Sequence, residues 1–239
     1  MPSADSRKSK VVVITGGSRG IGLAIARIFA ANDFSVVIAG LDEARLKAAV
    51  ATIGQSGAIG LQCDVTNPDL VKSLFARVHE QFREIHVLVN NAGVAHALSP
   101  IEQLPLEDWK KVIETNLTGT FLCTQAALPL MSAGSTIVNN LSIAAVKPFA
   151  GMSAYNASKF GALGFTNVLR EEVSKRGIRV LALLPGAVDT EIWEQFWPQA
   201  PREKMISADT VAQAVFHAVS VPAEATIEEL RIGPTAGAL

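Results

Sequence analysis

The 239-residue sequence has only two cysteines, four histidines and a formal net charge of −1. Cys63 and Cys123 are far apart and lie in apolar surroundings, so we expect two reduced, buried thiols and no disulfide. No histidines have the spacing of a metal site, and we expect no metal. With so little net charge, the chain has no bulk attraction to nucleic acid or to an anionic membrane surface, and we expect neither partner.

Long hydrophobic runs are also missing, since no run approaches the ~18 apolar residues of a membrane span. The apolar run after the basic N-terminus covers only residues 11–14, which is too short for a signal peptide. We therefore expect a cytoplasmic protein. No linker, repeat or low-complexity tract divides the sequence. These features predict an N-terminal tail at residues 1–10 and a single domain at residues 11–239.

Short apolar runs typical of buried strands alternate with segments of helical periodicity along the whole chain. This alternation predicts an α/β fold: a Rossmann-like, doubly wound sheet of seven mostly parallel strands with helices on both faces. We expect strands at residues 11–14, 35–39, 59–62, 86–89, 135–139, 179–184 and 229–232. We expect helices at residues 21–31, 41–53, 68–82, 106–131, 154–176 and 208–219. Ligands of such sheets bind beyond the carboxyl ends of the strands, where the strand order reverses.

Glycine crowds the turn between the first expected strand and the first expected helix, which reads Thr15-Gly16-Gly17-Ser18-Arg19-Gly20-Ile21-Gly22. Glycine permits positive φ and close approach of a ligand, and the free N–H groups at a helix start attract an anion such as a pyrophosphate. The spacing differs from the commonest dinucleotide motif, G-x-G-x-x-G. A dinucleotide site is the leading interpretation, and a merely tight connection is the alternative.

Tyr155 is the only tyrosine of the chain, and Lys159 follows it by four residues. Residues at this spacing share one face of a helix, so the ammonium can lie near the phenol. A nearby cation lowers the pKa of a phenol from its free value of about 10. The pair is therefore a candidate for proton transfer, and the alternative is a half-buried tyrosine beside a solvated lysine.

Four further motifs follow along the chain: Asn90-Asn91-Ala92-Gly93, Asn116, Ser142, and Pro185-Gly186 followed by Thr190. Together with the glycine turn and the Tyr155–Lys159 pair, they resemble the classical short-chain dehydrogenase/reductase (SDR) family from residue 11 to residue 239. The resemblance implies an NAD(P)-dependent oxidoreductase that interconverts an alcohol and a carbonyl by hydride transfer. The alternative is a non-catalytic nucleotide-sensing or scaffold protein on the same fold.

The resemblance also assigns roles to four catalytic residues. Tyr155 would be the general acid in reduction, and Ser142 would hold the substrate oxygen. Lys159 would bind the nicotinamide ribose and depress the pKa of Tyr155. Asn116 would hold a water in a proton relay, although it could also be an ordinary asparagine at a helix kink.

By the same resemblance, the cofactor would lie along the carboxyl edge of the sheet. The uncharged strand tip Gly40-Leu41 and the basic Arg19 favour NADP(H) over NAD(H), whereas the nearby Asp42 is a rival signal for NAD(H). The expected cofactor-binding residues are Gly16, Ser18, Arg19, Gly20, Ile21, Gly22, Gly40, Leu41, Asp64, Val65, Asn90, Ala92, Gly93, Tyr155, Lys159, Pro185, Gly186, Val188 and Thr190.

In this fold the connection at about residues 188–208 would cover the active site as a substrate loop. Its aromatic residues could line an apolar pocket or pack the loop down. We expect a small-molecule carbonyl or alcohol of small to medium size and apolar character. The candidates for substrate contact are His96, Phe149, Met152, Trp193 and Trp197.

The resemblance further implies a homodimer or homotetramer, packed through the expected helices 106–131 and 154–176. Both helices contain small residues that permit close packing. These residues could equally pack against the protein's own sheet, so the sequence leaves the interface open.

Overall fold

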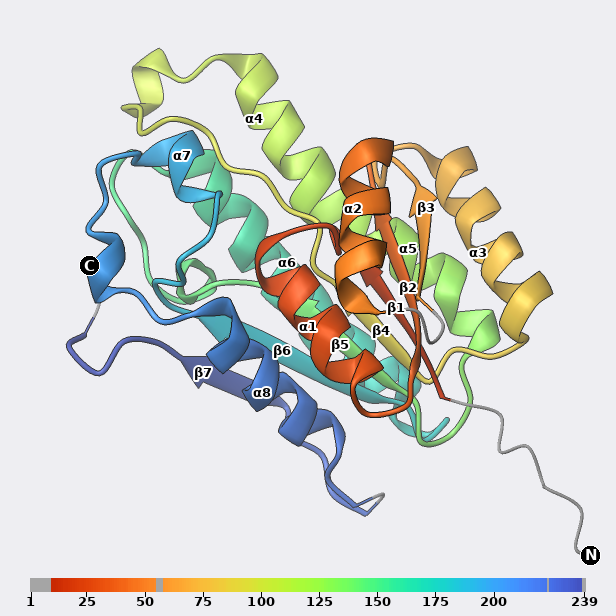
Figure 1. Ribbon diagram of the computed structural model, residues 1–239. Helices are drawn as coiled ribbons and strands as arrows, with labels where there is room; N and C mark the ends of the chain where they lie inside the picture. Colours follow the sequence, from red (N-terminus) through yellow and green to blue (C-terminus); the bar gives the residue numbers. More distant parts are fainter. Residues whose placement is uncertain (1–9, 55–57, 223, 238–239) are drawn as a thin grey trace, which may run out of the picture.

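A twisted, all-parallel sheet of seven strands forms the centre of the molecule (Figure 1). The computed structural model describes residues 10–54, 58–222 and 224–237. The strands lie in the order β3-β2-β1-β4-β5-β6-β7. Their bounds are β1 Val11–Thr15, β2 Ser35–Gly40, β3 Ala58–Gln62, β4 Val87–Asn90, β5 Thr136–Asn140, β6 Arg179–Pro185 and β7 Glu229–Ile232. The prediction of a doubly wound, Rossmann-like sheet is confirmed.

Helices cover both faces of this sheet (Figure 1). On one face lie α1 Gly20–Ala30, α2 Glu43–Ile53 and α8 Ala208–Val219. On the other lie α3 Pro68–Phe82, α5 Gly119–Ala127 and α6 Ser153–Ser174. Each face has its own apolar core, because the central strands alternate their side chains between the two sides. Ile14 and Ile38 belong to one core, and Val13 and Val37 belong to the other.

The expected helix 106–131 is not continuous. It consists of α4 Leu106–Ile113, a π-helical segment η2 Glu114–Thr118, α5, and a final 3₁₀ turn η3 Leu128–Leu130. Pro129 lies in that last turn and has no N–H to continue an α-helix. The π segment inserts an extra residue into the helical ladder, and Asn116 lies within it.

Other boundaries differ by one or two residues. The helix expected at 41–53 begins only at Glu43, because the side chain of Asp42 caps it by accepting a hydrogen bond from the Arg45 N–H. Short helical turns add η1 Ile101–Gln103, η4 Ile143–Ala145, α7 Trp193–Phe196 and η5 Arg202–Lys204. Of the expected tail 1–10, residues 1–9 lie outside the described residues, and Lys10 is exposed.

The strand order reverses at β1, which pairs with β2 on one side and with β4 on the other. The chain leaves β1 and β4 in opposite directions across the sheet, and this opens a crevice beyond their carboxyl ends. Cys63 and Cys123 are buried free thiols, as expected. None of the helices in the described ranges is both long and apolar enough to cross a membrane.

Candidate active site

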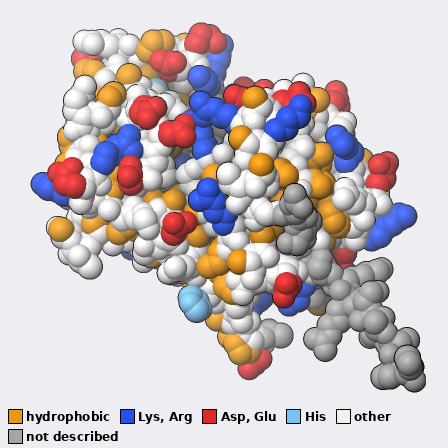
Figure 2. Space-filling model, viewed as in Figure 1, with side chains coloured by type: hydrophobic (Ala, Val, Ile, Leu, Met, Phe, Trp, Pro, Cys, Tyr) orange, Lys and Arg blue, Asp and Glu red, His pale blue; other side chains and the backbone are white. Residues whose placement is uncertain are grey.

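A large cleft of about 1340 Å³ lies at the carboxyl edge of the sheet, where the strand order reverses. It exceeds the roughly 300–1,000 Å³ of a typical small-molecule site, so it can hold a dinucleotide together with a small substrate. In the space-filling view, charged side chains of both signs surround the hollow at the centre of this face (Figure 2). The cleft is lined by the turns that follow β1, β2, β3, β4, β5 and β6.

The glycine turn after β1 forms one wall of this cleft. A β-carbon on Gly22 would lie 2.4 Å from Nδ2 of Asn91 and 2.5 Å from the Gly16 carbonyl oxygen. Gly16 has a φ of +63° and presses against the backbone of Ala92. These contacts allow the turns after β1 and β4 to meet closely. Among the described residues, no side chain caps the start of α1, which leaves its first N–H groups available to an anion in the cleft.

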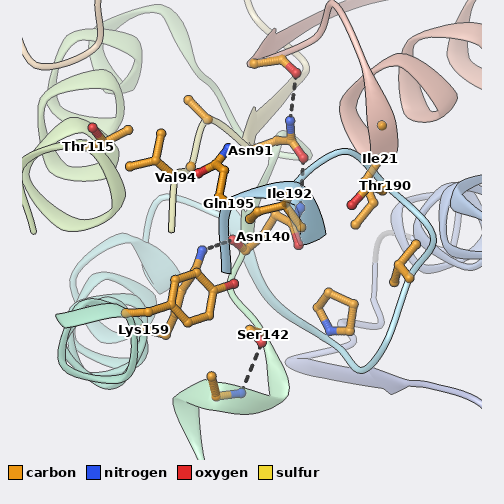
Figure 3. Close-up of a pocket in the computed structure, with 18 of the residues that line it drawn as sticks. Ile21, Asn91, Val94, Thr115, Asn140, Ser142, Lys159, Thr190, Ile192 and Gln195 are labelled. Atoms are coloured by element: carbon orange, nitrogen blue, oxygen red, sulfur yellow. Dashed lines mark hydrogen bonds between the residues drawn. The ribbon is translucent and has the colours of Figure 1, made fainter. Parts of the chain in front are cut away.

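A chain of hydrogen bonds connects this turn to α6. Asn91 donates to the carbonyl oxygens of Thr15 and Gly16, each at 3.0 Å, and accepts from Nδ2 of Asn140 at 2.8 Å. The carbonyl oxygen of Asn140 in turn accepts from Nζ of Lys159 at 3.0 Å. Figure 3 shows Asn140 between Asn91 and Lys159. Asn140, the last residue of β5, was absent from the predicted site, and Asn91, directly after β4, was part of the quoted motif but not of the expected cofactor-binding residues.

Tyr155 and Lys159 project from the first turns of α6, and both are buried. The ammonium lies 5.5 Å from the centre of the phenol ring. Burial raises the pKa of Tyr155 to about 12, and a hydrogen bond with Ser142 only partly opposes this rise. Burial also lowers the pKa of Lys159 to about 8. Burial thus dominates the pKa shifts of both groups, and the lowering of the Tyr155 pKa by Lys159 stays a prediction.

Ser142 follows β5 and lines the cleft, as does Lys159, and Figure 3 shows both residues in the close-up of the pocket. Its hydroxyl also accepts a hydrogen bond from the Ala144 N–H, which fixes the turn. Asn116 does not line the cleft. Its side chain accepts from the Val94 N–H at 2.9 Å and donates to the Val94 carbonyl oxygen and to Oγ of Ser158, each at 3.0 Å. Asn116 thus ties the loop after β4 to α6.

Most of the predicted cofactor residues line the cleft. Two do not: Gly22 packs behind the turn, and the buried Asn90 donates to Thr124 and Asn139 beneath the sheet edge. The residues that do line it are Gly16, Ser18, Arg19, Gly20, Ile21, Gly40, Leu41, Asp64, Val65, Ala92, Gly93, Tyr155, Lys159, Pro185, Gly186, Val188 and Thr190.

The segment after β6 closes over the phenol. Within α7, Phe196 stacks on Tyr155 with a ring separation of 6.4 Å, and Trp193 packs against Phe196 at 4.7 Å. Gln195 accepts a hydrogen bond from the Ala95 N–H at 2.8 Å, which joins this segment to the loop after β4. We call residues 190–197 the lid.

Of the substrate candidates, four line the cleft, namely Phe149, Met152, Trp193 and Trp197. His96 does not line it. Its ring is buried, and Nδ1 bonds to the carbonyl oxygen of Ala97. Phe196 is one of the aromatic residues expected to line an apolar pocket or pack the loop down, and it does line the cleft. Gln195 was missed by sequence reasoning, and the run of aromatic residues around it was the available signal.

Comparison with known proteins agrees with this geometry. The sequence pattern of the short chain dehydrogenase family matches residues 10–201, which is most of the chain. The chain belongs to this family. It is therefore an oxidoreductase of the SDR type, and the resemblance seen in the sequence is confirmed.

Individual SDR relatives act on different molecules. The chain is 37% identical over 189 residues to a 3beta-hydroxysteroid dehydrogenase of Mediterraneibacter gnavus, covering 78% of this chain and 68% of the relative. It is 34% identical to sulfoacetaldehyde reductase 2 of Chromohalobacter salexigens, over 95% of both chains. An alcohol dehydrogenase of the archaeon Thermococcus sibiricus, solved with 5-hydroxy-NADP, superposes with a TM-score of 0.88 at 28% identity, over 96% of this chain and 98% of the other.

Proposed function

We propose that this SDR protein uses NADP(H) in preference to NAD(H) to interconvert a carbonyl and an alcohol, with Tyr155 as general acid and base. The observation that carries the proposal is the arrangement of the phenol of Tyr155, the hydroxyl of Ser142 and the buried ammonium of Lys159. All three share one cleft with the glycine turn. The cofactor, when bound, supplies or accepts the hydride.

Reduction requires a proton for the carbonyl oxygen. Ser142 would hold that oxygen by a hydrogen bond, and Tyr155 would donate its proton to it. A phenol with a pKa raised to about 12 stays protonated at neutral pH, which suits a proton donor. Lys159 would bind the ribose hydroxyls next to the reacting ring, and Asn116 would position α6 and the loop after β4 around them.

The NADP(H) preference rests on the charges at the tip of β2. Arg19 and Arg45 both line the cleft beside Gly40. The carboxylate of Asp42, the rival signal for NAD(H), is engaged instead in capping α2 and in an ion pair with Arg45 at 3.5 Å. A ribose 2′-phosphate would meet guanidinium groups there. The complex of the Thermococcus sibiricus enzyme with 5-hydroxy-NADP supports the same preference.

The substrate end of the cleft favours an apolar molecule. Tyr155 belongs to an apolar cluster with Met152 and Ala144, and Phe149 and Phe196 pack against this cluster. An apolar substrate that binds against these side chains buries apolar surface away from water, which stabilises the complex. We therefore propose a small to medium, apolar ketone, aldehyde or alcohol as substrate.

The test is a panel of carbonyls and alcohols, followed by the absorbance of reduced nicotinamide, on the wild type and on Tyr155→Phe. We expect turnover with NADPH by the wild type, loss of at least about 10²-fold in kcat for the variant, and nearly unchanged cofactor binding. Tight cofactor binding without turnover of any panel member would favour the sensor or scaffold alternative. Turnover that survives in Tyr155→Phe would refute the catalytic assignment.

We also propose that the chain forms a homodimer or homotetramer through α5 and α6. Phe121, Phe160 and Val168 expose 42%, 46% and 58% of their surface on these helices. Of the small residues there, Gly161 packs against Leu117 of the same chain, whereas Gly164 has open space where a side chain would be. A second copy would bury these apolar groups. Sedimentation as a monomer at micromolar concentration would refute this part of the proposal.

A further inference from the structure

Glu191, the second residue of the lid, bonds to two arginines that come from distant parts of the chain. Its Oε2 accepts from Nη1 of Arg19 at 2.6 Å and from Nη1 of Arg45 at 3.1 Å. Arg19 lies in the glycine turn, and Arg45 lies in the first turn of α2. One carboxylate oxygen thus connects the lid, α1 and α2 across the mouth of the cleft.

Neighbouring side chains on both sides fix this position. A β-carbon on Gly20 would lie 3.2 Å from Cγ2 of Thr190, so the start of the lid rests directly on the glycine turn. Asp42 holds Arg45 from the other side through its ion pair at 3.5 Å. The two guanidinium groups therefore converge on one point beside the tip of β2, and Glu191 is the group that fills it.

Two converging guanidinium groups form the usual recognition site for a phosphate monoester. In doubly wound sheets the adenosine ribose lies at the tip of the second strand, where an arginine accommodates a 2′-phosphate. Here that tip is Gly40, which lines the cleft together with Arg19 and Arg45. The carboxylate of Glu191 is therefore bound where a dianionic phosphate would bind.

The ion pairs of Glu191 with Arg19 and Arg45 form at neutral pH, but they are weak enough for a phosphate to replace the carboxylate. The pKa of Glu191 is lowered, first by its hydrogen bond with Arg19, so the side chain remains ionised at neutral pH. Its partners are solvent-exposed, with 42% of the Arg19 side chain and 53% of the Arg45 side chain accessible. Exposed ion pairs contribute little free energy, so a phosphate with a higher charge can displace the carboxylate.

We propose that Glu191 is an internal competitor of the ribose 2′-phosphate for Arg19 and Arg45. It lowers the affinity of the cleft for phosphorylated dinucleotides and leaves the affinity for unphosphorylated ones unchanged. The same exchange frees the side chain of Glu191 from Arg19 and Arg45. The inference depends on the proposed function only in that the cofactor site accepts a 2′-phosphate.

Calorimetric titration with two cofactor fragments tests the competition without any turnover. The probes are adenosine 2′,5′-bisphosphate and 5′-AMP, which differ only in the 2′-phosphate. We expect Glu191→Gln to bind the bisphosphate roughly threefold to tenfold more tightly than the wild type, as expected for the loss of two exposed ion pairs, and to bind 5′-AMP equally well. Arg45→Gln should weaken binding of the bisphosphate alone by about tenfold.

Glu194→Gln is the matched control, because it removes the same charge from the same lid. Among the described residues, Glu194 forms no ion pair. We expect Glu194→Gln to bind both fragments like the wild type. An equal gain in Glu194→Gln would mean that only the net charge of the lid matters and would overturn the proposal. Thermal unfolding of each variant confirms that the folded protein is being compared.

The outcomes separate this inference from the proposed function. If the bisphosphate binds no better than 5′-AMP to the wild type and to Glu191→Gln, and NADH is preferred in turnover, both the NADP(H) preference and the competition fail. If the bisphosphate binds better than 5′-AMP but Glu191→Gln leaves that ratio unchanged or lowers it, the competition alone is refuted.

Discussion

Replacing Lys159 by methionine should change how the stability of the protein depends on pH. Lys159 is only 5% exposed, and burial lowers its pKa from 10.5 to about 8. Between these two values the unfolded chain binds more protons than the folded chain, so the free energy of unfolding rises with pH. Between pH 7 and pH 9.5 this linkage amounts to about 2 kcal/mol. The methionine variant lacks the titrating group and should lack this rise.

Urea denaturation followed by tryptophan fluorescence measures the effect at pH 7, 8 and 9.5. The free energy of unfolding of the wild type, relative to Lys159→Met, should increase by about 2 kcal/mol over this interval. Lys72→Met is the control, since it removes an equal charge from a side chain that is 76% exposed on α3. A difference between wild type and Lys159→Met that is flat or falls with pH would refute the assignment of a buried, destabilised ammonium.

Three further changes test other contacts of the site. Gly22→Ala should lower the free energy of unfolding by about 1–3 kcal/mol in urea, because the new β-carbon would lie 2.4 Å from Asn91; unchanged stability would contradict this packing. Asn116→Ala should lower kcat and stability without abolishing cofactor binding, as measured by steady-state kinetics and calorimetry, since it removes buried hydrogen bonds between α6 and the loop after β4. Phe196→Ala should lower the pKa of Tyr155 from about 12, because it uncovers the phenol. Tyrosinate absorbance after rapid pH jumps reports Tyr155 alone, the only tyrosine, and an unchanged midpoint would contradict the role of the lid.

The sheet could be predicted from sequence because its central strands are buried on both faces. Residues 11–14 and 35–39 are continuous apolar runs, and both proved to be strands within one residue of the expected bounds. The region 106–131 was predicted less well. Apolar periodicity continues through the π segment, and a one-residue insertion leaves no local signal in such a pattern. The cap at Asp42 was readable, since Asp, Asn, Ser and Thr commonly precede a helix.

The candidate site was predictable where it depends on short motifs and unpredictable where it depends on long-range contacts. Tyr155 and Lys159 are one helical turn apart, so their proximity follows from helix geometry alone. The contacts of Glu191 with Arg19 and Arg45 span 172 and 146 residues and have no local pattern. The sequence also did not show how deeply Tyr155 and Lys159 are buried. Burial sets the direction of the pKa shift of both groups.

The opposite pKa shifts of Tyr155 and Lys159 decide whether Tyr155 is a proton donor or a proton acceptor at neutral pH. In free side chains the phenol loses its proton at slightly lower pH than the ammonium does, which permits a phenolate beside a cation. In the structure the order is reversed, with Lys159 near 8 and Tyr155 near 12. A neutral phenol beside the ammonium is thus the stable state at neutral pH, which is the form that the proposed reduction needs. Oxidation of an alcohol needs the phenolate instead, and this requires additional positive charge or solvent near Tyr155. The lid residue Phe196 covers the phenol, so removal of its ring in Phe196→Ala should shift the protein toward the phenolate that oxidation needs.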